Sequence, residues 1–442
     1  MDWLRASVAE QGRAIMAGLI SPLEQTEAYL DAAAKHPYGA RIFARMTGER
    51  ARKESVAAHD RAKAGLRRGL LDGVAISWKD NIDTAGIATE AGSRLLEGRT
   101  PDQDAEILTN ATGEGLICLG KTHMTELAFS GLGLNPMTAT PPNAYDAALA
   151  PGGSSSGAAV SVALGLAAAA IGTDTGGSIR LPAAWNVLTG FKPTHGAISG
   201  QGIVPLCLRF DTPGPIARTV EDCALIFSAL TQTPAIDLSE TPNRKLRLLV
   251  LEGTPFDQAR DAPVAAFDDA VARLAKAGAQ INRATIPAVA EVFELAATVF
   301  APEAYGIWRA QIEDAPELMY QPILHRFRGG KDVLATDYIA AWIRLEELRQ
   351  EYAAATAGYD AVIVPTSPIL PPDAARLLSD PEFFARENLL ALRNTRIGNF
   401  MGLPAITLPT GQPACGIMLM GRAGGDRALL VTAAEAEAAL AR

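Results

Sequence analysis

The stretch that decides the fold reads Pro151-Gly-Gly-Ser-Ser-Ser-Gly157, then an Ala-rich segment, then Gly172-Thr-Asp-Thr-Gly-Gly-Ser-Ile-Arg180. Residues 147–173 carry no charge, and alanine and glycine dominate the segment between the two serine-bearing motifs. Such a segment is too weakly apolar for a lipid-facing helix, and glycine-rich turns bound it at both ends. We therefore predict a helix of small residues packed inside a protein, and no membrane span.

Short apolar runs on both sides of this stretch predict buried strands, and amphipathic runs between them predict helices. We expect strands at residues 73–78 (ending on Lys79), 116–119, 248–251 and 361–365. We expect helices at residues 23–33, 44–67, 104–111 and 263–276, with a further strand after the last of these. Strands that alternate with helices imply an α/β fold, in which a mixed, mainly parallel β-sheet is covered by helices on both faces.

The composition argues against several classes of protein. With 40 Lys and Arg against 49 Asp and Glu, the 442-residue chain has a formal net charge of −9, which disfavours a nucleic-acid-binding surface. The first residues lack the basic-then-apolar pattern of a secretory signal, so we expect a cytoplasmic protein. The cysteines form no CxxC pair and are interpreted as buried thiols in a reducing compartment: Cys118, Cys207, Cys223 and Cys415.

Two motif matches are misleading. Residues 115–122 fit the Walker A pattern with Lys121, but apolar strand formers occupy the place of the flexible phosphate loop, so we interpret them as a core strand. Residues 153–157 fit the nucleophile elbow GxSxG, which nominates Ser155. An elbow follows a hydrophobic strand, and the preceding Ala-Pro-Gly is a poor strand. Neither match is taken as a site.

The histidines point to no metal centre. None stands at metal-ligand spacing from a second histidine, and we expect no metal and no cofactor. A Ser-His-Asp triad stays open, because such triads assemble in space. Each histidine is interpreted as a surface or core residue: His36, His59, His123, His195 and His325.

The paired serine motifs resemble those of the amidase signature family of serine hydrolases. The likeness is strong from about residue 70 to 230 and thin from there to the end. Its further segments, in order, are Lys79-Asp-Asn-Ile-Asp-Thr-Ala-Gly86, Leu181-Pro-Ala183, Gly190-Phe-Lys-Pro-Thr194, Asp211-Thr-Pro-Gly-Pro215, Arg218-Thr-Val-Glu-Asp222, Asn399-Phe-Met-Gly402 and Pro404-Ala405.

This resemblance implies the fold of that family, a single large α/β domain over residues 1–442. Its expected parts are a helical N-terminal segment (1–65), a catalytic core (66–235), a variable substrate-side region (236–360) and a C-terminal return to the core (361–442). Because residues 237–359 match no motif, we expect that region to line most of the substrate pocket.

By motif position, the family's catalytic triad falls on Lys79 as base, Ser154 as bridge in a cis peptide bond after Gly153, and Ser178 as nucleophile. A serine hydroxyl is a weak nucleophile and needs a base to take its proton. Lysine, with an ordinary pKa of about 10.4, serves near neutral pH only where burial favours the uncharged amine. The apolar run that ends at Trp78 supplies such burial, so we expect Lys79 at the end of a buried strand.

The turn around the nucleophile has a second expected role. Backbone N–H groups of Thr175, Gly176, Gly177 and Ser178 can converge on the oxyanion of a tetrahedral intermediate, and glycine permits the close approach. Alone, this motif would indicate only a turn. The resemblance, with Lys79 in the expected order, favours the oxyanion hole.

Three further residues are less specific. Phe129 and Ser130 align with family positions that border the acyl pocket, although Phe129 could equally belong to the core. Arg180 can bind an anionic substrate, since its guanidinium suits carboxylates. We favour instead a structural ion pair between Arg180 and either Asp174 or Asp211, which would brace the loop.

The main interpretation is a serine hydrolase that cleaves the C–N amide bond of a small molecule through an acyl-enzyme on Ser178. The alternative is the A subunit of glutamyl-tRNA amidotransferase, which releases ammonia from glutamine for a partner protein. That protein usually has Gln where this chain has Leu181. A non-catalytic scaffold is a third interpretation, and the intact triad positions argue against it.

The sequence leaves the substrate open among aryl and aliphatic amides, hydrazides, carbamates and some esters. Asn186-Val187 stands where many relatives carry Cys-Gly, which warns against importing the substrate of one relative. The expected partner is a small-molecule amide, with no nucleic acid and no membrane, and a homodimer stays open.

Overall fold

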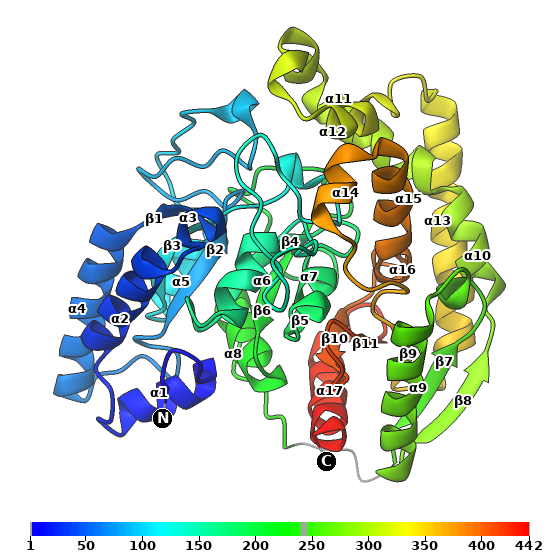
Figure 1. Cartoon of the computed structure of the whole chain (residues 1–442). Helices are drawn as coiled ribbons and strands as arrows, with labels where there is room; N and C mark the ends of the chain where they lie inside the picture. The colour runs from blue at the N-terminus through cyan, green and yellow to red at the C-terminus, as the bar shows by residue number, and fades with distance from the viewer. Residues whose placement is uncertain (1, 240–244, 442) are drawn as a thin grey trace.

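A mixed sheet of eleven strands runs through the molecule, and helices cover both of its faces (Figure 1). This computed structural model describes residues 2–239 and 245–441. The strand order across the sheet is β1-β3-β2-β4-β6-β5-β10-β11-β9-β7-β8. The strands are β1 (Phe43–Met46), β2 (Ala75–Lys79), β3 (Ile117–Thr122), β4 (Ala170–Asp174), β5 (Thr189–Lys192), β6 (Thr212–Ala217), β7 (Arg247–Leu251), β8 (Gln280–Ala284), β9 (Ala361–Pro365), β10 (Ala405–Pro409) and β11 (Gly416–Met420).

Parallel and antiparallel pairs occupy different parts of the sheet. β2 is parallel to β3 and β4, and β7 is parallel to β8 and β9. Between these groups, the pairs from β4 through β6, β5, β10 and β11 to β9 are antiparallel, as is β1 on β3. The predicted mixed α/β sheet is confirmed. Its antiparallel centre goes beyond the prediction, because short connections such as the one from β10 to β11 reverse the chain without a crossover helix.

Helices of the first half pack largely near the N-terminal strands. They are α1 (Val8–Met16), α2 (Pro22–Lys35), α3 (Gly39–Ile42), α4 (Gly48–Ala64), α5 (Glu106–Gly113), α6 (Ser156–Ala163), α7 (Arg180–Trp185) and α8 (Val220–Thr231). Those of the second half are α9 (Asp261–Lys276), α10 (Pro287–Glu294), α11 (Ala296–Asp314), α12 (Gln321–Arg328), α13 (Ala335–Thr356), α14 (Ala374–Ser379), α15 (Pro381–Ala391), α16 (Arg393–Phe400) and α17 (Asp426–Leu440). Short 3-10 turns are η1 (Arg94–Leu96), η2 (Glu126–Ala128), η3 (Thr254–Phe256) and η4 (Pro316–Leu318).

Strands β7, β9, β10 and β11 are buried on both faces over most of their length, because their side chains alternate between two apolar clusters, whereas the edge strand β8 is largely exposed. Leu248 and Val250 of β7 belong to the cluster that includes α5, α8, α9 and α17. Leu249 and Leu251 belong to the cluster that includes α10 to α13, α15 and α16. Figure 1 shows these second-half helices grouped on the side of the molecule away from α1, α2 and α4.

The helix expected over residues 44–67 is wrong at its start. Phe43–Met46 forms β1, whose backbone pairs with the edge of β3. Helix α4 begins only at Gly48 and ends at Ala64, and Gly65 closes it with a left-handed φ of 71°. A four-residue strand is too short to interrupt the helical periodicity that the sequence shows.

The Ala-rich segment contains a helix and a strand rather than one long helix. Helix α6 ends at Ala163, Gly165 has a φ of 73°, and the chain then enters β4. Both elements are buried, because small side chains let the helix lie close to the sheet. Among the described residues, no helix combines the length and apolar character needed to cross a bilayer.

Candidate active site

Lys79 ends β2 with its side chain fully buried, as expected from the sequence. Its Nζ atom lies 2.7 Å from Ser154 Oγ and 2.8 Å from Thr173 Oγ1. Burial lowers the pKa of Lys79 to about 7, although the nearby carboxylates of Asp211 and Asp174 favour the charged amine. A large share of the molecules therefore carries an uncharged Lys79 near neutral pH.

Ser154 and Ser178 lie on adjoining turns. The peptide bond between Gly153 and Ser154 is cis, as the resemblance implied. The backbone N–H of Ser155 donates to the carbonyl oxygen of Ser178 at 3.2 Å, which holds the two turns together. The Ser178 hydroxyl forms no hydrogen bond with any residue that the structure describes, and Ser178 lines a cavity. Catalytic hydrogen bonds often tighten only when substrate binds.

The turn of residues 175–178 offers free backbone donors to that cavity. The N–H groups of Thr175, Gly176 and Ser178 donate to no other described residue, whereas Gly177 N–H donates to Asp174 Oδ1 at 2.7 Å. Gly177 has a φ of 136°, and a Cβ atom there would collide with a neighbouring side-chain oxygen. Of the four expected oxyanion donors, Gly177 is thus already engaged, because the Asp174 carboxylate lies beneath it.

A buried ion pair braces this turn. Arg180 donates to both carboxylate oxygens of Asp174, from Nη2 at 2.8 Å and from Nε at 3.0 Å. Its remaining donors reach the carbonyl oxygen of Thr395 and the side-chain oxygen of Asn399, each at 2.6 Å. Burial disfavours charge on Asp174, but the Arg180 guanidinium outweighs it and lowers the pKa of Asp174 to about 2. The structure therefore places Arg180 against Asp174, not Asp211, and Arg180 does not line the cavity beside Ser178.

Helix α16 contributes contacts that the sequence did not reveal. Thr395 Oγ1 donates to the carbonyl oxygen of Gly176 at 2.8 Å, and Asn399 Nδ2 donates to Asp174 Oδ1 at 2.9 Å. Asn399 stood in one of the quoted motifs, so its importance could have been suspected. Thr395 lies in no motif, and only the folded chain brings it to the turn.

Asp211 supports the same turn from the other side. Its carboxylate accepts hydrogen bonds from the Thr175 hydroxyl and from the backbone N–H groups of Leu206 and Cys207. Burial raises the pKa of Asp211 to about 6, although these donors favour the charged form. Asp211 therefore helps to fix Thr175 beside the cavity.

A cavity of about 550 Å³ adjoins Ser178. Phe129 and Ser130 line it, where the resemblance placed them. Residues 237–359 were expected to form most of its wall, and they supply nearly half of it, through α10, α11, α12 and adjoining residues. Helices α15 and α16 form another side, because the C-terminal part of the chain packs across the sheet. Large side chains of the cavity wall include Phe293, Phe300, Arg326, Leu389, Leu392 and Arg396.

The segment that carries Phe129 and Ser130 is anchored to α15. Asn388 Oδ1 accepts hydrogen bonds from the Ser130 hydroxyl at 3.0 Å and from the next backbone N–H at 2.8 Å. Just before this segment, Leu127 and Ala128 have φ values of 44° and 62°. Left-handed backbone is uncommon for such residues, so tertiary contacts must impose the shape of this loop.

The residues rejected on sequence grounds have structural roles. Lys121 lies in the buried strand β3, where its Nζ donates to the carbonyl oxygen of Ile82 and to the Thr89 hydroxyl. The buried Ser155 hydroxyl donates to the carbonyl oxygen of Thr173. Within residues 2–239 and 245–441, no group of three or more His, Cys, Asp or Glu side chains is arranged to hold a metal ion.

Comparisons with known proteins agree with this geometry. The sequence model of the amidase family matches residues 24–430. The chain is 31% identical to the A subunit of glutamyl-tRNA(Gln) amidotransferase from Dehalococcoides mccartyi, over 97% of this chain and 96% of that protein. It is 33% identical to 2-amino-5-chloromuconic acid deaminase of Comamonas testosteroni, over 88% and 87%.

A solved structure extends the likeness to the whole fold. The native peptide amidase from Stenotrophomonas maltophilia matches with a TM-score of 0.81 at 27% identity, over 99% of this chain and 97% of that one. The family match covers the elements that carry the lysine, both serines and most of the cavity wall. The chain therefore belongs to the amidase family and is an enzyme that hydrolyses carbon–nitrogen bonds.

Proposed function

We propose that this enzyme cleaves the C–N amide bond of a small molecule through an acyl-enzyme on Ser178. The observation that carries the proposal is the contact between buried Lys79 Nζ and Ser154 Oγ, on a turn that adjoins Ser178. The cavity beside Ser178, at about 550 Å³, has the size of a small-molecule site.

In the proposed acylation, Ser178 Oγ attacks the amide carbonyl carbon while its proton passes to Ser154 Oγ. The Ser154 hydroxyl proton passes in turn to the uncharged Lys79 Nζ. Negative charge develops on the substrate carbonyl oxygen, and the free N–H groups of Gly176 and Ser178 are candidates to stabilise it. One such donor is worth about 2.7–4 kcal/mol in the transition state.

The intermediate collapses when the C–N bond breaks. The proton then returns from Lys79 through Ser154 to the leaving nitrogen, so an amine departs and an ester remains on Ser178. A water molecule attacks that ester, giving its proton to the same relay, and the acid product leaves as Ser178 regains its proton. Lys79 thus acts first as base and then as acid, both in acylation and in deacylation.

Two neighbours of Lys79 have a positioning role in this proposal. Thr173 Oγ1 lies 2.8 Å from Lys79 Nζ, and Asn81 Nδ2 donates to that hydroxyl oxygen at 3.1 Å. These contacts restrict the long side chain to one conformation near Ser154. We also assign the catalytic core to residues 66–235, which hold all three proposed triad residues.

The test is a panel of small amides, hydrazides, carbamates and esters, assayed with the wild type and with Ser178→Ala. We expect the wild type to hydrolyse at least one amide and Ser178→Ala to lose at least about 10⁴-fold in kcat. Full amide hydrolysis by Ser178→Ala, with purity checked by mass spectrometry, contradicts the proposal. Ser155→Ala, at the rejected serine of the same turn, is the matched comparison.

A second candidate function rests on the match to the A subunit of the amidotransferase over 97% of this chain. In that case Ser178 would attack the side-chain amide of glutamine, and ammonia would pass to a partner protein. The discriminating measurement is glutaminase activity of the isolated chain and of the chain co-expressed with a B-type partner. Turnover that appears only in a stable complex supports this candidate, and turnover of other amides by the isolated chain supports the first.

A further inference from the structure

Two arginines face the cavity beside Ser178 from different helices. Arg326 lies on α12 and Arg396 on α16, and both line the cavity. The Arg326 guanidinium carbon lies 4.6 Å from the ring centroid of Phe129. Arg396 runs beside the nucleophile turn, since a Cβ atom on Gly176 would lie 3.4 Å from Arg396 Cγ. Both cations are therefore within the walls of the proposed active site.

Neither arginine has a carboxylate partner among the described residues. Arg396 Nη2 donates to the carbonyl oxygen of Leu389 at 3.1 Å, and no described residue accepts a hydrogen bond from Arg326. The Nε atoms of both are buried without a partner. A guanidinium has five N–H donors, so most of the donors of these two residues have no partner among the described residues.

Burial and mutual repulsion oppose these charges. Burial lowers the pKa of Arg326 to about 10. Burial lowers the pKa of Arg396 to about 10 as well, with repulsion from Arg326 and Arg393 adding to it. Both side chains still carry a full charge at neutral pH. Both arginines are half-buried, and stacking of Arg326 on Phe129 offsets part of the cost of holding an unpaired cation there.

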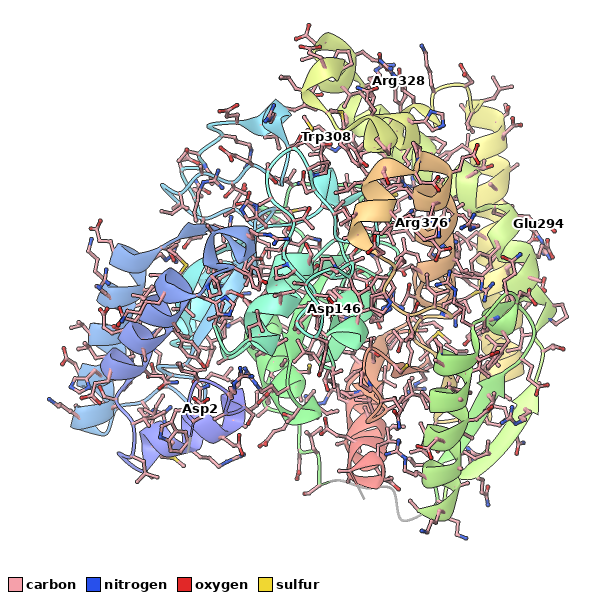
Figure 2. The ribbon with its side chains drawn as sticks, in the orientation of Figure 1. Asp2, Asp146, Glu294, Trp308, Arg328 and Arg376 are labelled. Carbon is pink, nitrogen blue, oxygen red and sulfur yellow. The ribbon has the colours of Figure 1, made fainter. Side chains whose placement is uncertain are left out.

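Two other arginines of the same region, Arg180 and Arg328, are paired with carboxylates, and Arg180 binds Asp174. Arg393 on α16 donates to the carbonyl oxygen of Pro255 and does not line the cavity. Arg328, two residues after Arg326, donates to both carboxylate oxygens of Glu313 outside the cavity. Glu294 is the one carboxylate among the described cavity residues, and it is exposed and forms no described ion pair. Figure 2 shows Glu294 at the outer edge of the molecule and Arg328 near the top of the view.

We propose that Arg326 and Arg396 form an anion subsite, and that the substrate is an amide whose acyl part bears a carboxylate. The inference rests on the proposed function and deepens it. A planar carboxylate matches the geometry of the guanidinium N–H donors. Two cations that have no carboxylate partner also favour the binding of an anion between them. The acyl side is assigned because Arg326 stacks on Phe129, the residue expected to border the acyl pocket.

The rest of the wall fits a short apolar spacer between the two ends of such a substrate. Phe293, Phe300 and Leu392 line the cavity together with the arginines. Methylene groups of a dicarboxylic acid half-amide would pack there, with the amide at Ser178 and the carboxylate at the subsite.

The experiment compares half-amides with uncharged amides of the same length. The probes are malonamate, succinamate, glutaramate and adipamate, each against the straight-chain amide in which methyl replaces the carboxylate. We expect the wild type to favour at least one half-amide in kcat/KM by about 10- to 100-fold. Arg326→Met and Arg396→Met should each reduce that preference by about 10-fold or more, mainly through KM. Arg328→Met is the matched control and should keep the wild-type preference.

The outcomes separate this inference from the proposed function. If the wild type hydrolyses amides but favours none of the four half-amides, the anion subsite is wrong while the acyl-enzyme mechanism stands. Equal losses for charged and uncharged amides in the two arginine variants also overturn it, since they indicate a merely structural role. If Ser178→Ala still turns over either class, the proposed function fails instead.

A binding measurement covers the case in which the variants lose all turnover. In the Ser178→Ala background, calorimetric titration with the matching dicarboxylate product should show binding that weakens at least about 10-fold in Arg326→Met and Arg396→Met. Unchanged binding in both double variants, with melting temperatures near that of Ser178→Ala, contradicts the subsite.

Discussion

The Nζ atom of Lys79 lies 2.7 Å from the Oγ atom of Ser154, and neither side chain has exposed surface. Two other lysines, Lys121 and Lys192, are also buried. The Lys192 Nζ donates to the carbonyl oxygen of Pro193 and meets no hydroxyl among the described residues. Lys121 Nζ donates to the Thr89 hydroxyl, but Thr89 does not line the cavity beside Ser178. The contact with Ser154, rather than burial alone, therefore singles out Lys79 as the candidate base.

The pH dependence of the reaction should report the protonation of Lys79. Because the base must be uncharged, kcat/KM should rise with pH and level off above an apparent pKa near the value of about 7 that burial gives Lys79. Lys192→Met is the control, since burial lowers the pKa of Lys192 to about 7 as well. If Lys192→Met folds correctly and shifts the midpoint of the pH profile of kcat/KM, the profile reports Lys192 and not Lys79.

Ser154→Ala should remove the proton relay but keep the nucleophile. We expect kcat to fall by about 10²–10⁴-fold, with little change in KM, because the substrate pocket lies on the Ser178 side. Steady-state kinetics and circular dichroism check this together. If Ser154→Ala keeps the wild-type kcat, the proton of Ser178 reaches Lys79 without Ser154, and the proposed relay is wrong.

Lys79→Met should stabilise the fold while abolishing activity. The folded pKa of Lys79 is about 7 and the unfolded pKa is about 10.4, so the unfolded chain binds more protons between these values. Burial of Lys79 therefore destabilises the protein at about pH 7.5, and stability rises with pH across that window. We expect Lys79→Met to gain about 1–3 kcal/mol in urea unfolding at about pH 7.5, with a smaller gain at about pH 9.5.

The matched control for that measurement is Lys53→Met, whose side chain is 76% exposed. It should change the free energy of unfolding by less than about 0.5 kcal/mol at either pH. A Lys79→Met variant that is less stable than the wild type at the lower pH would show that its hydrogen bonds outweigh the cost of its burial.

Arg180→Met should lower the free energy of unfolding by about 3–5 kcal/mol near neutral pH, because it leaves the buried Asp174 carboxylate without its cation. The folded pKa of Asp174 is about 2, below its unfolded value of about 3.9, so the pair stabilises the fold above about pH 4 and this contribution fades as pH falls toward 2. The loss caused by Arg180→Met should therefore be smaller at about pH 3.5. Arg13→Met, at an exposed ion pair with Glu221, should cost less than about 1 kcal/mol.

Much of the central site could be predicted because its signals are local. Lys79 follows an apolar run that is typical of a strand, and the two serines stand in glycine-rich turns with a recognisable order. The contacts from α15 and α16 could not be predicted in the same way. Asn388, Thr395 and Arg396 reach the site only because the C-terminal chain packs across the sheet, and one sequence does not specify such long-range packing.

The same distinction explains the errors in secondary structure. The four residues of β1 sit within a helical pattern, and only pairing with β3 makes them a strand. The Ala-rich segment has no periodicity that separates α6 from β4. The engagement of Gly177 N–H by Asp174 also depends on side-chain placement that the motif does not encode.

The proposed mechanism requires that Ser178 becomes acylated. The most direct test is mass spectrometry of enzyme quenched in acid during turnover of the best amide from the panel, followed by digestion. We expect the peptide that contains Ser178 to gain the mass of the acyl group in the wild type, and Ser178→Ala to trap no acyl group. Acylation of a different residue, or equal trapping in Ser178→Ala, would contradict the mechanism.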